Sequence, residues 1–346
     1  MKAAVLEALD RLVVQDVPTP EVGPGSMLLK VHACAVCGSD LRIYHYGNPR
    51  VVPPQTLGHE IAGEVVAVGP GVAGFAVGDR VAVGADVPCG VCELCRAGLG
   101  NNCAINYAIG YQFAGGFAEF ILLNETTMRY GPVHKIPGDL SYAEAALAEP
   151  LACCLNGLEL CRLAVGETVV IIGAGPAGLL LAQLARHMGA TKTILAQRSK
   201  GRLELARHFD IDVLVSTTEE DLVERVRAET DGRGADVVVT ACASPDAQEQ
   251  AILLAAHRGR INFFGGLPKG TRPLTLDSNV IHYRELLVTG SHGSVPRHHK
   301  AALGLIACGA INARDLITHR FPLEAILDGF AVVEKRAGMK AIVNPS

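Results

Sequence analysis

A glycine-rich turn between an apolar strand and an amphipathic helix restricts the fold of this chain more than any other feature. Residues 168–172 read TVVII, and the helix pattern GLLLAQLARHM follows the turn. In this context the first glycine makes the turn, the second lets backbone approach a pyrophosphate, and the third lets the helix pack on the strand. The helix N-terminus then offers N–H donors to phosphates. The alternative is a tight turn without a ligand; we favour dinucleotide binding by Gly173, Gly175, Pro176, Ala177 and Gly178.

The alternation of strands and helices continues beyond that turn. Apolar strands alternate with amphipathic helices in residues 191–209, 235–257 and 259–266. This repeat predicts an α/β fold with a doubly wound parallel sheet, the Rossmann fold, over residues 150–290. Before residue 147 the chain shows short alternating strands separated by Gly and Pro, which predicts a β-rich barrel. The C-terminal segment is expected to return to that half, so that residues 1–149 and 291–346 form one domain.

Charge and hydropathy narrow the range of partners. The chain has 31 Lys and Arg against 35 Asp and Glu, a net charge of −4, which gives no electrostatic reason to bind nucleic acid or an anionic membrane. The longest apolar run, residues 169–182, is interrupted by glycines and Pro176 and is shorter than the ~20 residues that span a bilayer. Glu7 and Asp10 interrupt any signal-peptide apolar region. We expect a cytoplasmic protein with a small-molecule partner.

Four cysteines stand close together in PCGVCELCRAGLGNNC, at positions Cys89, Cys92, Cys95 and Cys103. Four thiolates at this spacing can form a tetrahedron around Zn²⁺, with Zn–S bonds of about 2.3 Å and no open position for chemistry. The alternatives are four buried thiols or two disulfides. The glycines and asparagines between the cysteines are not typical of a core, and the expected compartment disfavours disulfides. Residues 89–103 are therefore predicted to be a structural zinc lobe.

A second set of donors is spread along the first half of the chain. Cys37 lies in CGSD, His59 and Glu60 lie in GHE, and Glu149 lies in AEP. Each residue alone is more often structural than ligating. Together they offer S, N and O donors, the set expected of a catalytic zinc that keeps a position open for water or substrate. Glu60 and Glu149 compete for the last protein position, or one of them acts from outside the ligand shell.

The second Rossmann strand ends in ILAQRSKGR, residues 194–202. An NAD enzyme needs an acid here for the ribose 2′-hydroxyl, but this segment has Gln197 and no carboxylate. Positive charge and donors suited to a 2′-phosphate come instead from Arg198, Ser199, Lys200 and Arg202. The segment predicts that NADP(H) is preferred and NAD(H) possible, the alternative being a solvated basic turn.

The motifs CGSD, GHExxGEV, PCGVCELC, AEP and GAGPAG occur in an order and spacing that resemble the zinc-dependent medium-chain dehydrogenase/reductase family over essentially the whole chain. The resemblance implies a GroES-like catalytic domain, a Rossmann domain and two zinc ions per chain. Glu149 stands where alcohol dehydrogenases of the family carry a cysteine, as in the polyol (sorbitol/L-iditol) and threonine dehydrogenase branch. The family also implies a homodimer or homotetramer, and residues 286–288 are expected to lie exposed at the sheet edge.

The resemblance implies hydride transfer between NADP(H) and a polyol or other secondary alcohol. Ser39 matches the hydroxyl residue that relays the substrate proton, and Arg42 stands where that branch usually has a histidine, so the relay is expected to run toward Arg42 or His45. Residues 292–294 read His-Gly-Ser where threonine dehydrogenases tend to have Tyr-Gly-Arg. The alternatives are an L-threonine 3-dehydrogenase-like enzyme and a non-catalytic nucleotide-binding relative. Residues 297–299, Arg-His-His, either meet a phosphorylated polyol or begin a solvated helix.

Overall fold

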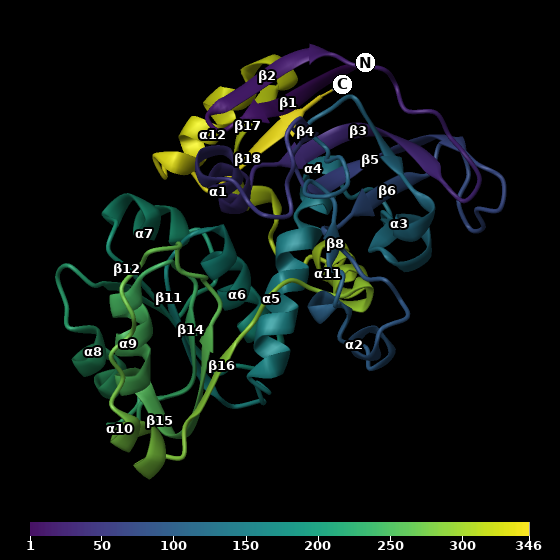
Figure 1. Cartoon of the computed structure of the whole chain (residues 1–346). Coiled ribbons are helices and arrows are strands. Elements are labelled where there is room, and N and C mark those ends of the chain that lie inside the picture. The colour runs from purple at the N-terminus through teal and green to yellow at the C-terminus, as the bar shows by residue number, and fades with distance from the viewer. Residues whose placement is uncertain (346) are drawn as a thin grey trace. The chain divides into compact units, whose positions relative to one another are not determined.

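The computed structural model describes residues 1–345 and divides the chain into two compact units. Unit 1 comprises Met1–Ala152, Gly293–Gly309 and the chain from Ala313 onward, and unit 2 comprises Cys153–His292 and Ala310–Asn312 (Figure 1). The backbone N–H of Asn312 donates to Gln183 Oε1 at 2.7 Å, which ties that short segment to unit 2. No helix among the described residues is long and apolar enough to cross a membrane.

Unit 1 is β-rich. A seven-stranded sheet runs in the order β10-β6-β5-β3-β18-β17, with β9 also pairing with β3. Its strands are β3 (Met27–Ala35), β5 (Glu60–Val68), β6 (Arg80–Val83), β9 (Phe120–Leu123), β10 (Val133–Lys135), β17 (Ile317–Pro322) and β18 (Lys340–Asn344). A three-stranded sheet joins β1 (Lys2–Ala8), β2 (Arg11–Asp16) and β4 (Gln55–Thr56), and a two-stranded one joins β7 (Asp86–Val87) and β8 (Tyr107–Ala108). Because β18 pairs with β3, the C-terminal strand belongs to this unit.

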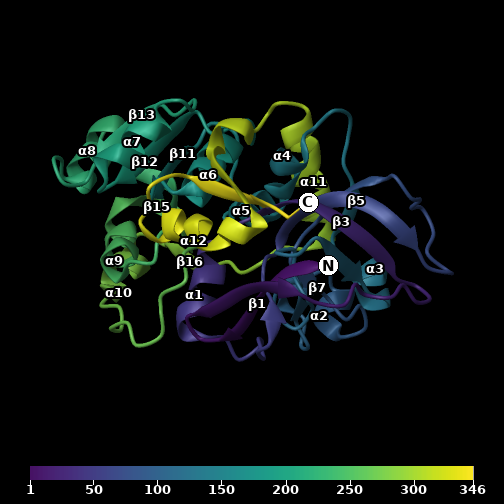
Figure 2. The same cartoon turned by 90° about the horizontal axis from the view of Figure 1, so that it is seen from above.

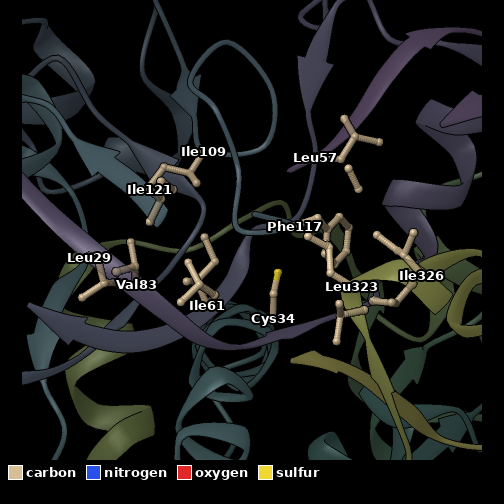
Figure 3. Close-up of a cluster of buried hydrophobic side chains, with 14 of the residues drawn as sticks. Leu29, Cys34, Leu57, Ile61, Val83, Ile109, Phe117, Ile121, Leu323 and Ile326 are labelled. Atoms are coloured by element: carbon tan, nitrogen blue, oxygen red, sulfur yellow. The ribbon is translucent and has the colours of Figure 1, made fainter. Parts of the chain in front are cut away.

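Helices fill the connections of unit 1. They are α1 (Gly38–Tyr46), α2 (Glu93–Arg96), α3 (Glu125–Tyr130), α4 (Tyr142–Ala146), α11 (Pro296–Ala307), α12 (Ile326–Glu334) and the start of α5 (Ala148–Leu160). The core is a cluster of aliphatic and aromatic side chains, drawn in Figure 3, that includes Leu29, Cys34, Ile61, Phe117 and Ile326. Burial of such side chains contributes about 1.5–3 kcal/mol each, so the β3–β5 pair at its centre is firmly fixed.

The register of that strand pair brings distant segments together. β3 and β5 are antiparallel, and Ala35 lies opposite Glu60. Cys37 follows the end of β3 as the N-cap of α1, and His59 immediately precedes β5. The thiol and the imidazole, which are far apart in sequence, are therefore brought to one end of the same strand pair.

Unit 2 is a six-stranded parallel sheet in the order β13-β12-β11-β14-β15-β16, which confirms the doubly wound Rossmann prediction. The strands are β11 (Thr168–Ile172), β12 (Lys192–Gln197), β13 (Val213–Ser216), β14 (Ala235–Thr240), β15 (Ala255–Phe263) and β16 (Leu287–Gly290). The helices are α6 (Pro176–His187), α7 (Lys200–Ala206), α8 (Leu222–Glu229), α9 (Pro245–Leu254) and α10 (Ser278–Tyr283) (Figure 2). Every residue of β11 is buried, as expected for a strand covered on both faces.

The sheet edge differs in one detail from the expectation. β16 begins at Leu287, and Leu286, expected to be exposed, is 6% exposed and packs in the unit 2 core. Leu287 and Val288 are 56% and 38% exposed on this edge strand. The exposed apolar edge is therefore one residue shorter than expected.

Candidate metal and cofactor sites

The four cysteines of residues 89–103 converge on one point. Their sulfur atoms all lie within 4.8 Å of one another. Cys95 Sγ is 3.9 Å from Cys89 Sγ and 3.4 Å from Cys92 Sγ, near the ~3.8 Å edge of a tetrahedron with Zn–S bonds of about 2.3 Å. All eleven cysteines are free thiols, so the two-disulfide alternative is wrong. The donor set fits a zinc ion with four thiolate ligands and no open position.

Backbone amides of this lobe donate hydrogen bonds to the cysteine sulfur atoms. The N–H of Cys89 donates to Cys103 Sγ at 3.3 Å, and the N–H of Cys92 donates to Cys89 Sγ at 3.4 Å. Hydrogen bonds from backbone amides, that of Ala104 first, lower the pKa of Cys92 to about 6. Because a thiolate is the form that binds metal, these amides favour the ligating state of Cys92, whereas burial and the neighbouring Cys92 raise the pKa of Cys95 to about 12.

A second donor cluster contains Cys37, His59 and Glu60, whose ligating atoms lie within 4.8 Å of one another. His59 and Glu60 are buried, and Cys37 is half-buried. Sulfur, nitrogen and oxygen donors in this number leave room for a further ligand on a tetrahedral zinc. The chemistry of the set fits a catalytic zinc.

Asp40, which the sequence analysis did not assign, orients this cluster. Its Oδ1 lies 3.2 Å from His59 Nδ1, and its Oδ2 accepts the Cys37 backbone N–H at 2.9 Å. An Nδ1–H that faces a carboxylate leaves Nε2 for a metal. Burial opposes protonation of His59, but Asp40 and Cys37 outweigh it and raise the pKa of His59 well above its usual value.

Lys340 is a second residue that the sequence analysis missed. Its Nζ lies 2.5 Å from both carboxylate oxygens of Glu60, and the two side chains are 5% and 0% exposed. Burial disfavours the charged amine, but the Glu60 carboxylate outweighs that effect and raises the pKa of Lys340. One acid of the cluster is thus held in a buried ion pair.

Glu149 lies in the first turn of α5 and is buried, but its carboxylate is outside the group of atoms within 4.8 Å. Burial raises the pKa of Glu149 to about 7; the His59 and Lys340 charges oppose this rise, and Glu60 and Asp86 add to it. Glu149 therefore faces the same centre as Glu60. Both acids are still candidates for the last ligand position.

The glycine-rich turn has the geometry that the sequence predicts. Gly173 has φ +118°, and a Cβ on Gly178 would lie 1.8 Å from the Gly173 carbonyl oxygen, so both positions require glycine. Around Gly175 only the Arg202 side chain approaches among the described residues, with Nη1 3.1 Å from the position of a Cβ. Pro176 and Ala177 begin α6, with Pro176 at its first position. The backbone of Gly175 is open to a ligand, and Gly178 packs the helix on the turn.

The basic segment after β12 lies beside that turn. Gln197 ends β12, Arg198 and Ser199 are exposed, and Ser199 is the N-cap of α7 without a side-chain capping bond. Lys200 pairs instead with Glu219. Arg202, whose guanidinium lies over Gly175, is the cation that the structure places against the glycine turn.

Comparison with known proteins agrees with both units. The family model for the alcohol dehydrogenase GroES-like domain matches residues 23–137, and that for zinc-binding dehydrogenase matches residues 176–307. A sorbitol dehydrogenase of Halalkalibacterium halodurans is 33% identical over 96% of this chain and 95% of its own. The chain belongs to the zinc-dependent medium-chain dehydrogenase family.

Two further members of the family are similar over most of their length. An L-threonine 3-dehydrogenase of Pyrococcus horikoshii is 36% identical over 90% of this chain and 87% of its own. The crystal structure of a zinc-binding dehydrogenase from Sinorhizobium meliloti, bound to NADP, has a TM-score of 0.92 and 36% identity, and covers 99% of both chains. The chain therefore shares the two-domain fold of this family and is a dehydrogenase.

The residues predicted for the dehydrogenase proton relay fall into different surroundings. Ser39 Oγ lies 3.3 Å from His59 Nε2, at the donor cluster. Arg42 is exposed and stands three residues after Ser39 on α1, so the two share a helix face. His45 lies between two carboxylates, with Nδ1 2.5 Å from Asp10 Oδ1 and Nε2 3.1 Å from Glu334 Oε1. Ser39 thus lies beside the proposed zinc ligands, whereas both ring nitrogens of His45 face the carboxylates of Asp10 and Glu334.

The expectation for residues 297–299 was wrong in part, because two of these side chains are not on the surface. His298 and His299 are 2% and 1% exposed, on the inner face of α11. His299 Nδ1 lies 3.0 Å from His134 Nδ1, with the two rings stacked. The run of basic residues predicts a surface cluster, but these two imidazoles lie on the side of α11 that faces the core.

Proposed function

We propose that this chain transfers hydride between NADP(H) and a polyol or another secondary alcohol. The observation that carries the proposal is the buried cluster of Cys37, His59 and an acid beside the Ser39 hydroxyl. The similarity to a sorbitol dehydrogenase supports it. A zinc ion held there would supply the Lewis acidity that lowers the pKa of the substrate hydroxyl, and the nicotinamide would take the hydride.

The side chains around the cluster have separate roles in the proposed reaction. Cys37 and His59 hold the metal, with Glu60 or Glu149 as the remaining protein ligand. Asp40 fixes the tautomer of His59. Ser39 accepts the hydroxyl proton and releases its own proton toward solvent along the helix face that carries the exposed Arg42, whose guanidinium is already charged and takes no proton. His45 is engaged by Asp10 and Glu334.

The second zinc of each chain is proposed to be structural. Cys89, Cys92, Cys95 and Cys103 fill all four positions of a tetrahedron, so this ion would stabilise the lobe and take no part in turnover. Elemental analysis of protein purified without chelator is expected to give two zinc ions per chain. One zinc per chain and no turnover of any alcohol would favour the non-catalytic alternative.

NADP(H) is proposed as the preferred cofactor. Gln197 leaves the end of β12 without the negative charge that would repel a 2′-phosphate, and Arg198 and Ser199 are exposed beside it. Arg202 adds positive charge over the glycine turn. The NADP bound to the Sinorhizobium meliloti relative is consistent with this preference.

Steady-state kinetics with both cofactors and a panel of sorbitol, xylitol, inositols and L-threonine tests the whole proposal. Charge-assisted hydrogen bonds contribute about 1.5–3 kcal/mol, so Arg198→Ala is expected to lower kcat/KM for NADP about 10- to 100-fold. Lys200→Met, which removes a cation already paired with Glu219, is the matched control. Equal use of NAD by the unmodified protein would contradict the cofactor proposal, and a preference for L-threonine would favour the threonine dehydrogenase alternative.

Self-association is proposed through the β16 edge, where Leu287 and Val288 are exposed. An apolar edge strand invites pairing with a second copy across a two-fold axis, giving a homodimer or, by a second contact, a homotetramer. Light scattering at micromolar concentration tests this, with Val288→Lys expected to shift the mass toward the monomer. A monomeric unmodified protein would contradict the proposal. The cytoplasmic location stays a prediction, which cell fractionation tests.

A further inference from the structure

Arg50 lies close to the proposed catalytic cluster. Its guanidinium carbon is 4.9 Å from the centroid of the Tyr111 ring. The Tyr111 ring is in turn 5.9 Å from the His59 ring, and its side chain hydrogen bonds with that of Ser39. A cation therefore stands one aromatic ring away from the residues that would handle the reacting hydroxyl.

The segment that carries Tyr111 is held in place by its own hydrogen bonds. Gln55 Nε2 donates to the Tyr111 carbonyl oxygen at 2.7 Å, and the Gly110 N–H donates to the Phe113 carbonyl oxygen at 2.9 Å. Gln112 Oε1 accepts the backbone N–H of Ala108 at 3.1 Å. Tyr111 is thus a fixed platform, and the position of Arg50 over it is defined.

Arg50 has donors that the described residues do not use. A guanidinium offers five N–H groups, and here Nη2 donates to the carbonyl oxygen of Asn106. Nε is buried and has no hydrogen-bond partner among residues 1–345, and no carboxylate in that part of the chain forms an ion pair with Arg50. Arginine with free donors is suited to planar or tetrahedral oxyanions, which accept two N–H groups at once.

We propose that Arg50, supported by Tyr111, binds an oxyanion on the substrate, so that the preferred substrate is a secondary alcohol with an anionic group. This inference rests on the proposed function. The Tyr111 ring contacts both the guanidinium and the His59 ring, with its centroid 4.9 Å from the one and 5.9 Å from the other, whereas only two bonds join the hydroxyl carbon and the carboxyl carbon of a 3-hydroxy acid. The geometry therefore favours the phosphate ester at the end of a sugar-alcohol phosphate. The buried imidazoles of His298 and His299 leave Arg50 as the better candidate for this contact.

Matched substrates that differ only in the anion test the inference. We would compare kcat/KM for D-sorbitol and sorbitol 6-phosphate, and for D-arabitol and its 1-phosphate, with L-threonine as the carboxylate arm. The unmodified enzyme is expected to prefer the phosphorylated member of each pair about 10- to 100-fold. Arg50→Met should remove that preference mainly through the KM for the phosphorylated substrates, with a much smaller loss of kcat/KM for the neutral polyols, and Arg50→Lys should keep part of the preference.

The control variant is Arg129→Met, because Arg129 also lies over a tyrosine, 5.2 Å from the Tyr130 centroid, but is exposed. It should behave as the unmodified enzyme with every substrate. Equal kcat/KM for neutral and phosphorylated alcohols, or an equal loss on both in Arg50→Met, would overturn the inference while the proposed dehydrogenase stands. Preference for L-threonine with a KM that depends on Arg50 would support the oxyanion contact and assign it to a carboxylate.

If no alcohol is oxidised, the proposed function fails and Arg50 is tested by binding alone. Inorganic phosphate, added in the presence of saturating NADPH, should raise the Tm of the unmodified protein more than that of Arg50→Met. Equal shifts in the two proteins would overturn the oxyanion contact.

Discussion

Breaking the buried ion pair between Lys340 and Glu60 is expected to destabilise unit 1 strongly. Lys340 Nζ lies 2.5 Å from both Glu60 oxygens, in a place where neither side chain is exposed beyond 5%. Lys340→Met keeps most of the aliphatic packing but leaves a buried carboxylate without its cation. Removing one partner of such a pair costs about 3–5 kcal/mol, mostly because the remaining charge is desolvated and unpaired.

The double variant separates this effect from lost packing. Lys340→Met combined with Glu60→Gln removes both charges, so it should recover more than half of the stability lost in either single variant. For a domain of this size, 1 kcal/mol corresponds to about 2–4 °C, so each single variant should lower Tm by roughly 6–20 °C. The control is Arg314, whose side chain is 79% exposed where it pairs with the half-buried Glu144, and Arg314→Met should cost less than about 1 kcal/mol.

Urea unfolding followed by circular dichroism is the assay. It should be run with and without a chelator, because a metal that binds only the folded state adds stability of its own. Single variants within about 1 kcal/mol of the unmodified protein would refute the assignment of a buried charge pair. A double variant as unstable as the sum of the singles would show that packing, and not charge, explains the losses.

Three further predictions concern other parts of the molecule. Cys103→Ser should lower Tm and loosen the cysteine lobe, whereas Cys37→Ser should abolish turnover with little change in Tm, because only Cys103 is a structural ligand. Zinc content, Tm and activity measured on both variants test this prediction. The opposite pattern would exchange the two assignments. Gly178→Ala should prevent normal folding of unit 2, because the alanine Cβ would lie 1.8 Å from the Gly173 carbonyl oxygen. Gly175→Ala should fold normally and raise the KM for NADP, and circular dichroism and steady-state kinetics measure these two effects. Equal folding of both variants would contradict the close packing at Gly178. Burial lowers the pKa of His134 to about 4 and that of His299 to about 3, with Lys300 adding to the effect on His134, so the unfolded chain takes up protons near pH 6.5 before the folded one does. Stability should therefore fall as pH drops from about 6.5 toward 4, by roughly 1–2 kcal/mol per histidine at pH 5, and urea unfolding of His299→Phe should show a smaller fall; an unchanged pH dependence would contradict it.

The features that the sequence predicted are those encoded over short distances. The glycine turn and the cysteine lobe each lie within one short segment, and the alternation of strands and helices indicates the Rossmann sheet without knowledge of any contact. Asp40 lay within the CGSD motif, where its position three residues after Cys37 could have indicated a capping carboxylate. Lys340 carried no such signal, because its partner Glu60 is 280 residues away and only the β18–β3 pairing brings them together.

Errors arose where the identity of a residue was taken as a guide to its exposure. His298 and His299 follow Arg297 in a basic run, which is typical of a surface, but the stacked contact with His134 shows that a neutral imidazole can fill core space. Leu286 was assigned to an exposed edge as part of the predicted last Rossmann strand, yet it packs inward one residue before β16 begins. In both segments the helix or strand period, and not composition, decides which side chain faces the core.

The charge of the buried centre gives an argument for a metal that does not depend on motif spacing. Among residues 1–345 the buried acids are Asp40, Glu60, Asp86 and Glu149, and the one buried lysine is Lys340. All five act on one another or on His59 through their charges, so they form a single electrostatic centre. Ionised groups without compensating charge are costly to bury, and proteins resolve this by pairing them or by coordinating a metal. With four acids against Lys340, the centre is short of positive charge, which a proton on His59 supplies in the metal-free protein and which a divalent cation on Cys37 and His59 would supply in place of that proton.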